Sequence, residues 1–423
     1  MLSAEQDVTT TFDIAWVRAQ FPSLSQTVNG HPAVFFDGPG GTQVPQRVID
    51  AISNYLKQSN ANTGGAYATS RGTDAMIAEA RAAMADFLGC DADEIVFGPN
   101  MTTLTFALSR AIGRQLGPDH EIVVTHLDHD ANISPWRALE ERGANLRFVE
   151  INEADCTLDM ADMARKITGH TRLVAAGYAS NAVGTINNVR EMVRLAHEAG
   201  AMAFIDAVHY APHGPMDVRE LDCDFLVCST YKFFGPHMGV LYGKREHLKR
   251  LYPYKVRANT DSIPNRWEWG TLNHECIAGI TACVEYLADL GRRAKPPVTG
   301  RRAALRAAYQ AIQPYERSLT ERMVRGLLQI PGLKLYSISD PKLFAQRAPT
   351  VAVRIEGHTP LELATRLGER GFFTWDGNYY ALNLTERLDV EKSGGFLRIG
   401  LVHYNTAEEV DRFLMALGEF VRG

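Results

Sequence analysis

The chain has 423 residues, of which 45% are hydrophobic and 22% are charged, and its formal net charge is −5. This length predicts two domains of an ordinary globular protein, and the slightly acidic charge excludes a nucleic-acid-binding surface that depends on excess positive charge. No stretch approaches the roughly 20 apolar residues of a membrane span, and the N-terminus lacks the pattern of a secretory signal, so we expect a cytoplasmic protein with no membrane partner.

The first feature along the chain is a short strand from Val34 that breaks into glycines, VFFDGPGGTQVP. It lacks the GK[ST] ending of a P-loop and the GxGxxG of a dinucleotide site, so we expect a tight turn. Residues 73–88 then repeat apolar side chains at helical spacing, and Gly89 marks the end of the predicted helix.

A strand at residues 94–97 is followed by a turn and a second helix, which begins near Asn100. This order places the backbone N–H groups around Asn100, Met101 and Thr102 at a helix N-terminus, where they can bind an anion. The alternative is a structural N-cap formed by Asn100 or Thr102.

Two further strands, residues 121–125 and a run from Arg172, also end in polar residues. His129 follows the first, where its ring either stacks on a flat cofactor or lies at the surface. Asn181 follows the second. A helix at residues 188–200 then leads to the next strand, and this alternation predicts a mainly parallel sheet with right-handed crossovers.

Two apolar runs, residues 203–206 (AFID) and 224–229 (DFLVCS), have the length and composition of buried parallel strands. The carboxyl ends of such strands meet at the ligand-binding edge of a sheet, so we expect Asp206 and Lys232 to lie in one crevice. Pyridoxal 5'-phosphate (PLP) requires such a pair, because a lysine binds its aldehyde and an aspartate keeps its ring nitrogen protonated. An ordinary ion pair is the alternative.

The residues around this pair favour the cofactor. Ser229 and Tyr231 offer hydroxyl groups beside the lysine, as a phosphate requires, and His209 follows Asp206 closely.

A basic stretch from Gly291, GRRAKPPVTGRRAALR, contains Pro-Pro and glycine, and we expect an exposed hinge there rather than a binding patch. Beyond it, short strands and helices alternate up to the amphipathic residues 407–420, which predicts a compact α+β domain. The expected divisions are an N-terminal segment that packs with the small domain (1–30), a large PLP-binding domain (31–295) and a small C-terminal domain (296–423).

In combination, IDAVH from Ile205 and CSTYKFFGPHMG from Cys228 resemble the cofactor segment of the class V aminotransferase family, in particular its group II cysteine desulfurases. The pair Tyr231 and Lys232 is more like kynureninase. The resemblance runs from about Val34 to the end of the chain. It implies the PLP-dependent transferase fold type I, which is α/β with a mainly parallel central sheet, helices on both faces and a smaller α+β C-terminal domain.

The resemblance also implies roles for single residues. Lys232 and Asp206 match the cofactor lysine and its aspartate, and His129 matches the ring that stacks on PLP. The other matches are Met101 and Thr102 at the phosphate turn, Asn181 beside the PLP oxygen and the substrate carboxylate, His209, Ser229 and Tyr231 around the cofactor, Arg398 for the substrate α-carboxylate, and Thr271 for the phosphate of the neighbouring subunit. The match at Thr271 implies a homodimer.

The chain departs from the desulfurase pattern at two places. His209 stands where desulfurases usually have glutamine. Their nucleophilic cysteine lies in a context like RTGHHCA, whereas the aligned stretch here is WDGNYYA, from Trp375, and Tyr380 takes the place of the cysteine. We expect no persulfide on this loop, because a phenol cannot accept sulfur in that form. The spacing of the six cysteines predicts neither a metal site nor a disulfide framework: Cys90, Cys156, Cys223, Cys228, Cys276 and Cys283.

These features together predict a PLP-dependent enzyme that acts on a small amino acid through its Cα carbanion. The expected reaction is that of a cysteine desulfurase-like C–S lyase, or a related β or γ lyase, without a persulfide-forming loop cysteine. An epimerase or an aminotransferase of the same family is the alternative, and a binding scaffold without catalysis is a third. Tyr380 either donates a hydrogen bond or proton to a leaving group, or only packs.

Overall fold

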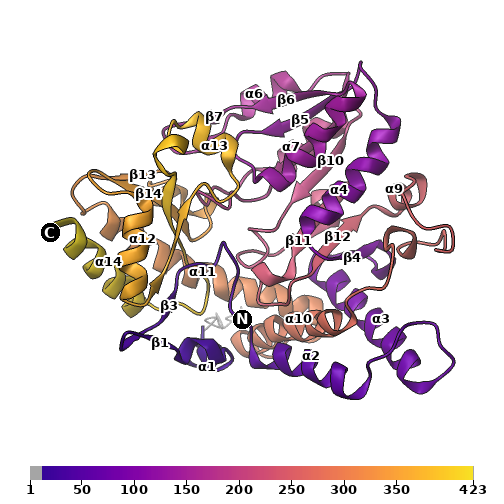
Figure 1. Cartoon of the computed structure of the whole chain (residues 1–423), viewed down its shortest axis with the longest axis horizontal. Coiled ribbons are helices and arrows are strands. Elements are labelled where there is room, and N and C mark those ends of the chain that lie inside the picture. The colour runs from indigo at the N-terminus through magenta and orange to yellow at the C-terminus, as the bar shows by residue number, and fades with distance from the viewer. Residues whose placement is uncertain (1–11, 423) are drawn as a thin grey trace, which may run out of the picture.

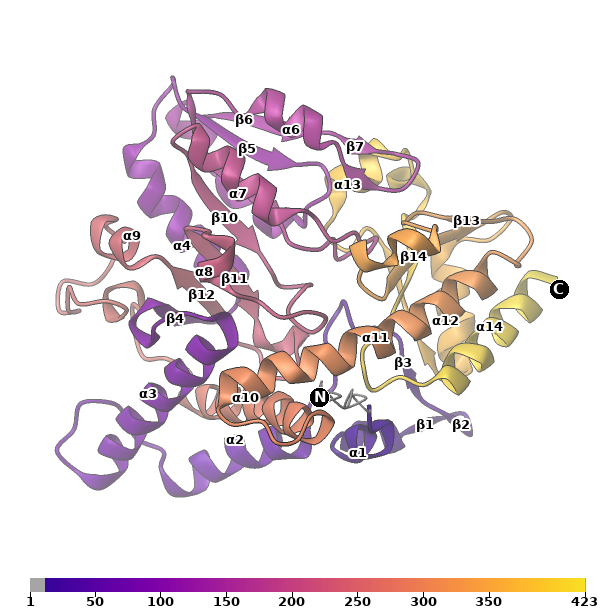
Figure 2. The same cartoon turned by 180° about the vertical axis from the view of Figure 1, so that it is seen from behind.

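The computed structural model of the chain describes residues 12–422. Its largest sheet has seven strands in the order β4-β12-β11-β10-β9-β5-β6, all parallel to their neighbours except β12, which is antiparallel to β11 and β4. Helix α4 (Met101–Ile112) covers one face and α7 (Val189–Glu198) the other (Figure 1, Figure 2). The predicted mainly parallel α/β fold is confirmed. The strands are β4 (Ile95–Gly98), β5 (Glu121–Thr125), β6 (Asn145–Val149), β9 (Thr171–Gly177), β10 (Met202–Asp206), β11 (Phe225–Ser229) and β12 (Gly239–Gly243).

The central strands form because their short apolar runs are buried on both faces of the sheet. Every residue of β11 is buried, and β10 pairs with it so that Asp206 lies opposite Val227. Strand β10 ends at Asp206, and Lys232 ends a single turn of 3-10 helix that follows β11. Both residues therefore emerge at the carboxyl edge of the sheet, as predicted.

Helix α3 (Ala68–Leu88) begins before the predicted residue 73 but ends at the predicted Gly89, which has a left-handed φ of 79°. Its first turn is polar and carries no helical pattern of apolar residues. Ser70 is nevertheless buried, because its hydroxyl donates to the carbonyl of Asn62 and accepts from the N–H of Gly65. A tertiary contact with the preceding loop therefore extends this helix.

The C-terminal part contains a second, antiparallel sheet in the order β13-β14-β17-β16 (Leu333–Leu335, Thr350–Ile355, Phe396–Gly400 and Trp375–Gly377). Helices α12 (Pro360–Glu369) and α14 (Ala407–Arg422) accompany it, as predicted. The stretch from Trp375 was expected to be a loop, but it begins with β16, in which Trp375 pairs with Arg398. The sequence does not predict this edge strand, because it has no alternating apolar pattern; only its backbone pairing with β17 defines it.

The basic stretch from Gly291 is helical except at residues 295–300, which are largely exposed, so the predicted exposed hinge can only be this short connection. Helix α10 (His274–Ala294) and α11 (Arg301–Leu327) leave only residues 295–300 between them. Arg301 forms ion pairs with Glu79 at 2.6 Å and Glu285 at 3.0 Å, and these acidic partners are distant in sequence. In Figure 2, α11 runs from α10 to the small sheet.

The predicted domain limits stay predictions. Residues 1–11 of the predicted N-terminal segment lie outside the described residues. Within the rest of that segment, Arg18 on α1 (Ile14–Ala19) donates to the carbonyl of Tyr404 at 2.7 Å. The other elements are α2 (Gln46–Gln58), α5 (Ser134–Arg137), α6 (Met160–Lys166), α8 (Val218–Leu221), α9 (Arg245–Arg250), α13 (Leu382–Arg387), β1 (Thr27–Val28), β2 (His31–Pro32), β3 (Val34–Phe35), β7 (Ile151–Asn152), β8 (Thr157–Leu158) and β15 (Phe372–Phe373).

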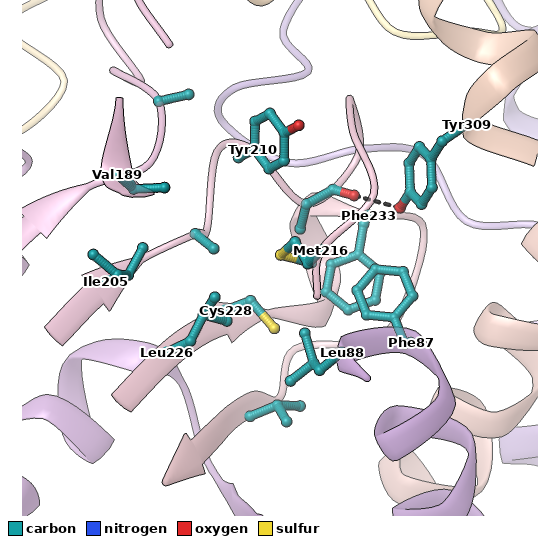
Figure 3. Packing of buried hydrophobic residues seen from close by; sticks show 14 of the residues in the cluster. Phe87, Leu88, Val189, Ile205, Tyr210, Met216, Leu226, Cys228, Phe233 and Tyr309 are labelled. Atoms are coloured by element: carbon teal, nitrogen blue, oxygen red, sulfur yellow. Dashed lines mark hydrogen bonds between the residues drawn. The ribbon is translucent and has the colours of Figure 1, made fainter. Parts of the chain in front are cut away.

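Figure 3 shows the apolar core beside the central strands. The rings of Phe87 and Phe233 stack with their centroids 4.8 Å apart, and the hydroxyl of Tyr309 on α11 donates to the carbonyl of Ala211 at 2.5 Å. These contacts hold the segments that follow β10 and β11, and both segments carry predicted site residues. Across residues 12–422, no helix combines the length and the apolar character needed to cross a membrane.

Candidate active site

A pocket of about 240 Å³ lies where the carboxyl edge of the large sheet meets the small domain. Ten predicted site residues line it: Met101, Thr102, His129, Asn181, Asp206, His209, Tyr231, Lys232, Tyr380 and Arg398. Lining residues that the prediction missed include Asp128, Trp375, Tyr379 and Pro39, the last in the turn predicted after Val34. Ser229 and Thr271 lie outside the pocket lining.

Lys232 and Asp206 are the charged pair at the centre of the pocket. Burial, helped by the nearby Arg398 charge, lowers the pKa of Lys232 to about 7, although Asp206 acts in the opposite direction. The Nζ atom of Lys232 donates to the carbonyl of Pro39. Burial raises the pKa of Asp206 to about 6, although its Oδ1 accepts from the N–H of Val208 at 2.9 Å. A substantial fraction of Lys232 is therefore a neutral amine near pH 7, as a nucleophile requires.

The N-terminus of α4 faces the pocket through Met101 and Thr102. Asn100 is the N-cap, since its Oδ1 accepts from the N–H of Thr103 at 2.9 Å. Ser229 lies behind this turn, and its hydroxyl accepts from the N–H of Met101 at 3.1 Å. A Cβ atom on Gly239 would lie 2.4 Å from the backbone of Asn100, so only glycine allows β12 to pass so close. Thr102 lies at the second helical position, where N–H groups have no acceptor within the helix, and this suits a phosphate.

His129 and Asp128 occupy the turn after β5. Burial, helped by the charge of Lys232, lowers the pKa of His129 to about 4, so the ring is neutral at pH 7. Its Nδ1 accepts from the N–H of Ala131 at 2.9 Å, which places the proton of the neutral ring on Nε2. Asp128 accepts from the N–H of Gly177 at 2.7 Å, and a Cβ on Gly177 would lie only 2.6 Å from the Asp128 Oδ1 atom. Burial raises the pKa of Asp128 to about 8. In the sequence, only the position of Asp128 directly before His129 indicates that Asp128 belongs to the site.

His209 and Tyr231 both lie between Asp206 and Lys232 in sequence. The Nε2 atom of His209 lies 3.1 Å from the Thr350 hydroxyl, and burial lowers the pKa of His209 well below its usual value. The Nζ atom of Lys232 is 4.9 Å from the centroid of the Tyr231 ring. Both aromatic rings therefore border the space in front of the lysine.

Arg398 on β17 is only 3% exposed, so it is not a surface arginine. Its Nη1 donates to the carbonyl of Asn181 at 3.0 Å. Within residues 12–422, the buried Nε of Arg398 and the buried Oδ1 of Asn181 have no hydrogen-bond partner. A donor and an acceptor that are buried without partners are costly, unless a ligand satisfies them. Both residues line the pocket, and a ligand with a carboxylate and a hydroxyl or amine would serve both atoms.

The stretch from Trp375 lines one side of the pocket with Trp375, Tyr379 and Tyr380. Tyr380 has a left-handed φ of 60°, its carbonyl accepts from the N–H of Asp130 at 2.7 Å, and its ring stacks on His129 with centroids 5.3 Å apart. The side chain is 71% exposed and lies at the mouth of the pocket. No cysteine is among the residues that line this pocket.

Thr271 lies elsewhere, along a separate cavity of about 430 Å³ that it shares with Trp269 and His237. Because the prediction assigns Thr271 to the site of a neighbouring subunit, it does not require Thr271 to line the pocket of its own chain.

The pocket fits PLP on these observations. Lys232 offers an amine for the aldehyde, and the buried Asp206 offers a carboxylate for the ring nitrogen. The N-terminus of α4 offers N–H groups for the phosphate, and His129 offers a neutral flat ring. The site thus holds each kind of group that the cofactor needs.

The model of the family described as "Aminotransferase class-V" matches residues 34–413. The chain is 34% identical to a probable cysteine desulfurase of Mycolicibacterium paratuberculosis over 97% of its length but spans only 59% of that relative. It is 33% identical to a probable cysteine desulfurase of Synechocystis sp., over 96% of both chains. The apo structure of a cysteine desulfurase from Thermococcus onnurineus is similar with a TM-score of 0.83, at 26% identity over 94% of this chain and 99% of that one.

Proposed function

The chain belongs to the class V aminotransferase family and is a cysteine desulfurase-like, PLP-dependent enzyme, and on this premise we propose that it is a lyase for a small amino acid, cleaving a C–S or related β or γ bond. The observation that carries this proposal is the convergence of Lys232, Asp206 and Arg398 on one pocket whose lining includes Tyr380 and no cysteine. The alternatives of an epimerase and an aminotransferase differ in what becomes of the substrate after the Cα proton is removed.

PLP, when bound, supplies an electron sink for the substrate Cα. Lys232 would hold the cofactor through its amine; once the substrate amine has taken its place there, the freed Lys232 amine would accept the Cα proton, for which a pKa lowered to about 7 is well suited. The Asp206 carboxylate would keep the ring nitrogen protonated. Arg398 binds the substrate α-carboxylate through its planar guanidinium, and Asn181 orients the same group. His129 would pack against the cofactor ring.

Assays of product identity test the proposed reaction. Amino acids incubated with the PLP-loaded enzyme should release sulfide, or another leaving group, together with ammonia and a 2-oxo acid, which is pyruvate for cysteine and 2-oxobutyrate for a γ-substituted four-carbon substrate. Racemised substrate without a released group would instead establish an epimerase, and a keto acid with retained amine would establish an aminotransferase. No change in any amino acid would favour the scaffold without catalysis.

Tyr380 cannot store sulfur, because a phenol forms no persulfide. Its hydroxyl either donates a hydrogen bond or proton to the leaving group, or its ring only closes the pocket mouth. We therefore expect no sulfur adduct on residues 375–381 after incubation with L-cysteine, and sulfide released directly into solution. Mass spectrometry of the peptide that holds residues 375–381, and of the peptides that carry the six cysteines, checks this expectation. The Tyr380→Cys variant is the matched control and should acquire the adduct. An adduct on a native cysteine that forms at the turnover rate would overturn the proposal.

We also propose a homodimer in which Thr271 contacts the phosphate bound by the partner subunit. This rests on the family match around WEWGT and on the position of Thr271 outside its own pocket. Thr271→Ala should weaken PLP retention about tenfold, the cost of one hydrogen bond to a charged group. Dialysis against buffer, followed by the absorbance of retained cofactor, measures it, with Thr365→Ala on α12 as the control. A fully active monomer in light scattering would exclude this arrangement.

The six cysteines are all free, which supports a cytoplasmic location.

A further inference from the structure

Tyr379 contacts the guanidinium of Arg398 face-on. The Cζ atom of Arg398 lies 4.0 Å from the centroid of the Tyr379 ring, well within the range of a cation–π contact. Burial lowers the pKa of Arg398 to about 10, and Tyr379 acts in the opposite direction. The cation–π contact offsets part of the cost of burying this cation without occupying any of its N–H donors.

The Tyr379 side chain is itself held in place. Its hydroxyl is within hydrogen-bond distance of the carbonyls of Trp375, at 3.1 Å, and of Phe396. Its backbone has a left-handed φ of 57°, an uncommon conformation for a residue with a large side chain. Such a conformation persists where surrounding contacts enforce it, and these are frequent at functional sites.

The backbone of Tyr379 also holds the other residue assigned to the carboxylate. Its carbonyl accepts from the Nδ2 of Asn181 at 2.9 Å, and the carbonyl of Asn181 accepts from Arg398 at 3.0 Å. Asn181, Tyr379 and Arg398 therefore form a closed ring of contacts. Within this ring of contacts, the buried Nε of Arg398 and the buried Oδ1 of Asn181 have no hydrogen-bond partner among the described residues.

We propose that Tyr379 is a positioning residue, which holds Arg398 and Asn181 in the orientation that receives the α-carboxylate of the substrate. This inference rests on the carboxylate role proposed for Arg398. Stacking fixes the plane of the guanidinium, and the bond to Asn181 fixes the amide, so that an edge of each group faces the ligand.

Two probes separate the carboxylate from the rest of the substrate: 3-mercaptopropionate, which keeps the carboxylate and thiol of cysteine without its amine, and cysteamine, which lacks the carboxylate. Calorimetric titration of the PLP-loaded enzyme gives the affinity for each. Tyr379→Leu should weaken binding of 3-mercaptopropionate about tenfold and change that of cysteamine less than about twofold. Tyr379→Phe keeps the ring and should retain most of the affinity. The KM of a turned-over amino acid should rise in the leucine variant more than its kcat falls.

Two control variants make the outcome decisive. Tyr336→Leu removes a ring whose centroid lies 4.5 Å from the Nζ atom of Lys334. This variant should leave the affinity for both probes unchanged. Arg398→Gln should abolish 3-mercaptopropionate binding. If it does not, the carboxylate role of Arg398 fails and the inference fails with it. If Arg398→Gln weakens this probe but Tyr379→Leu does not, or if Tyr379→Leu weakens both probes equally, the positioning role alone is wrong.

Discussion

Replacing Lys232 with alanine should abolish covalent attachment of PLP and lower amino-acid turnover by about a thousandfold or more, because the same amine binds the cofactor and removes the Cα proton. The fold should persist. Burial lowers the pKa of Lys232, so the folded protein disfavours the charged amine, and its removal relieves that cost. The visible absorbance of the purified variant, before and after borohydride, measures the attachment, and a thermal melt measures the fold.

Lys255→Ala is the matched control, since the Lys255 amine is also largely buried, donates to the carbonyl of Asn259 at 2.7 Å and is absent from the pocket lining. This variant should keep both the chromophore and the activity. A borohydride-sensitive chromophore that survives in Lys232→Ala would show that another lysine binds the cofactor, and the assignment of the site would be wrong.

The second large effect is expected for Asp206→Asn, which should retain PLP but lose activity by about a hundredfold or more, because an amide cannot hold the proton on the ring nitrogen. The effect on stability has the opposite sign. Burial raises the pKa of Asp206 from 3.8 to about 6, so the folded state binds the proton more tightly than the unfolded state. The carboxylate therefore costs stability as the pH rises from about 4 through 6, and this cost is fully present at pH 7.

Thermal melts of the cofactor-free protein at pH 5 and pH 7.5 check this sign. Asp206→Asn should melt no lower than the wild type at pH 7.5, and its advantage should shrink at pH 5. Activity and cofactor absorbance are measured on the same preparations. Full activity in the amide variant would refute the role of Asp206, whereas loss of the fold would show that the carboxylate holds the β10 end together.

Local sequence patterns accounted for the central part of the site. Asp206 and Lys232 were predicted together because strand ends are visible as breaks in short apolar runs, and parallel strands deliver their ends to one edge. The N-cap at Asn100 and the helix end at Gly89 were likewise predictable, because each depends on the conformation of a few consecutive residues. The family, the fold class and the cofactor followed from these positions and the motifs around them.

Other parts of the site depend on long-range contacts that no local pattern encodes. Tyr379 meets Asn181 across 198 residues of sequence, and its role is visible only because β16 pairs with β17 and brings it beneath Arg398. Asp128 differs from other aspartates through its burial and the close approach of Gly177. The acidic partners of Arg301 also come from other helices. The sequence alone therefore determined the alternation of strands and helices and the chemical groups at the strand ends, since both arise from neighbouring residues. The tertiary structure decided which distant side chains bury those groups, fix their orientation and shift their pKa values, since burial and electrostatic contacts depend on distance in space.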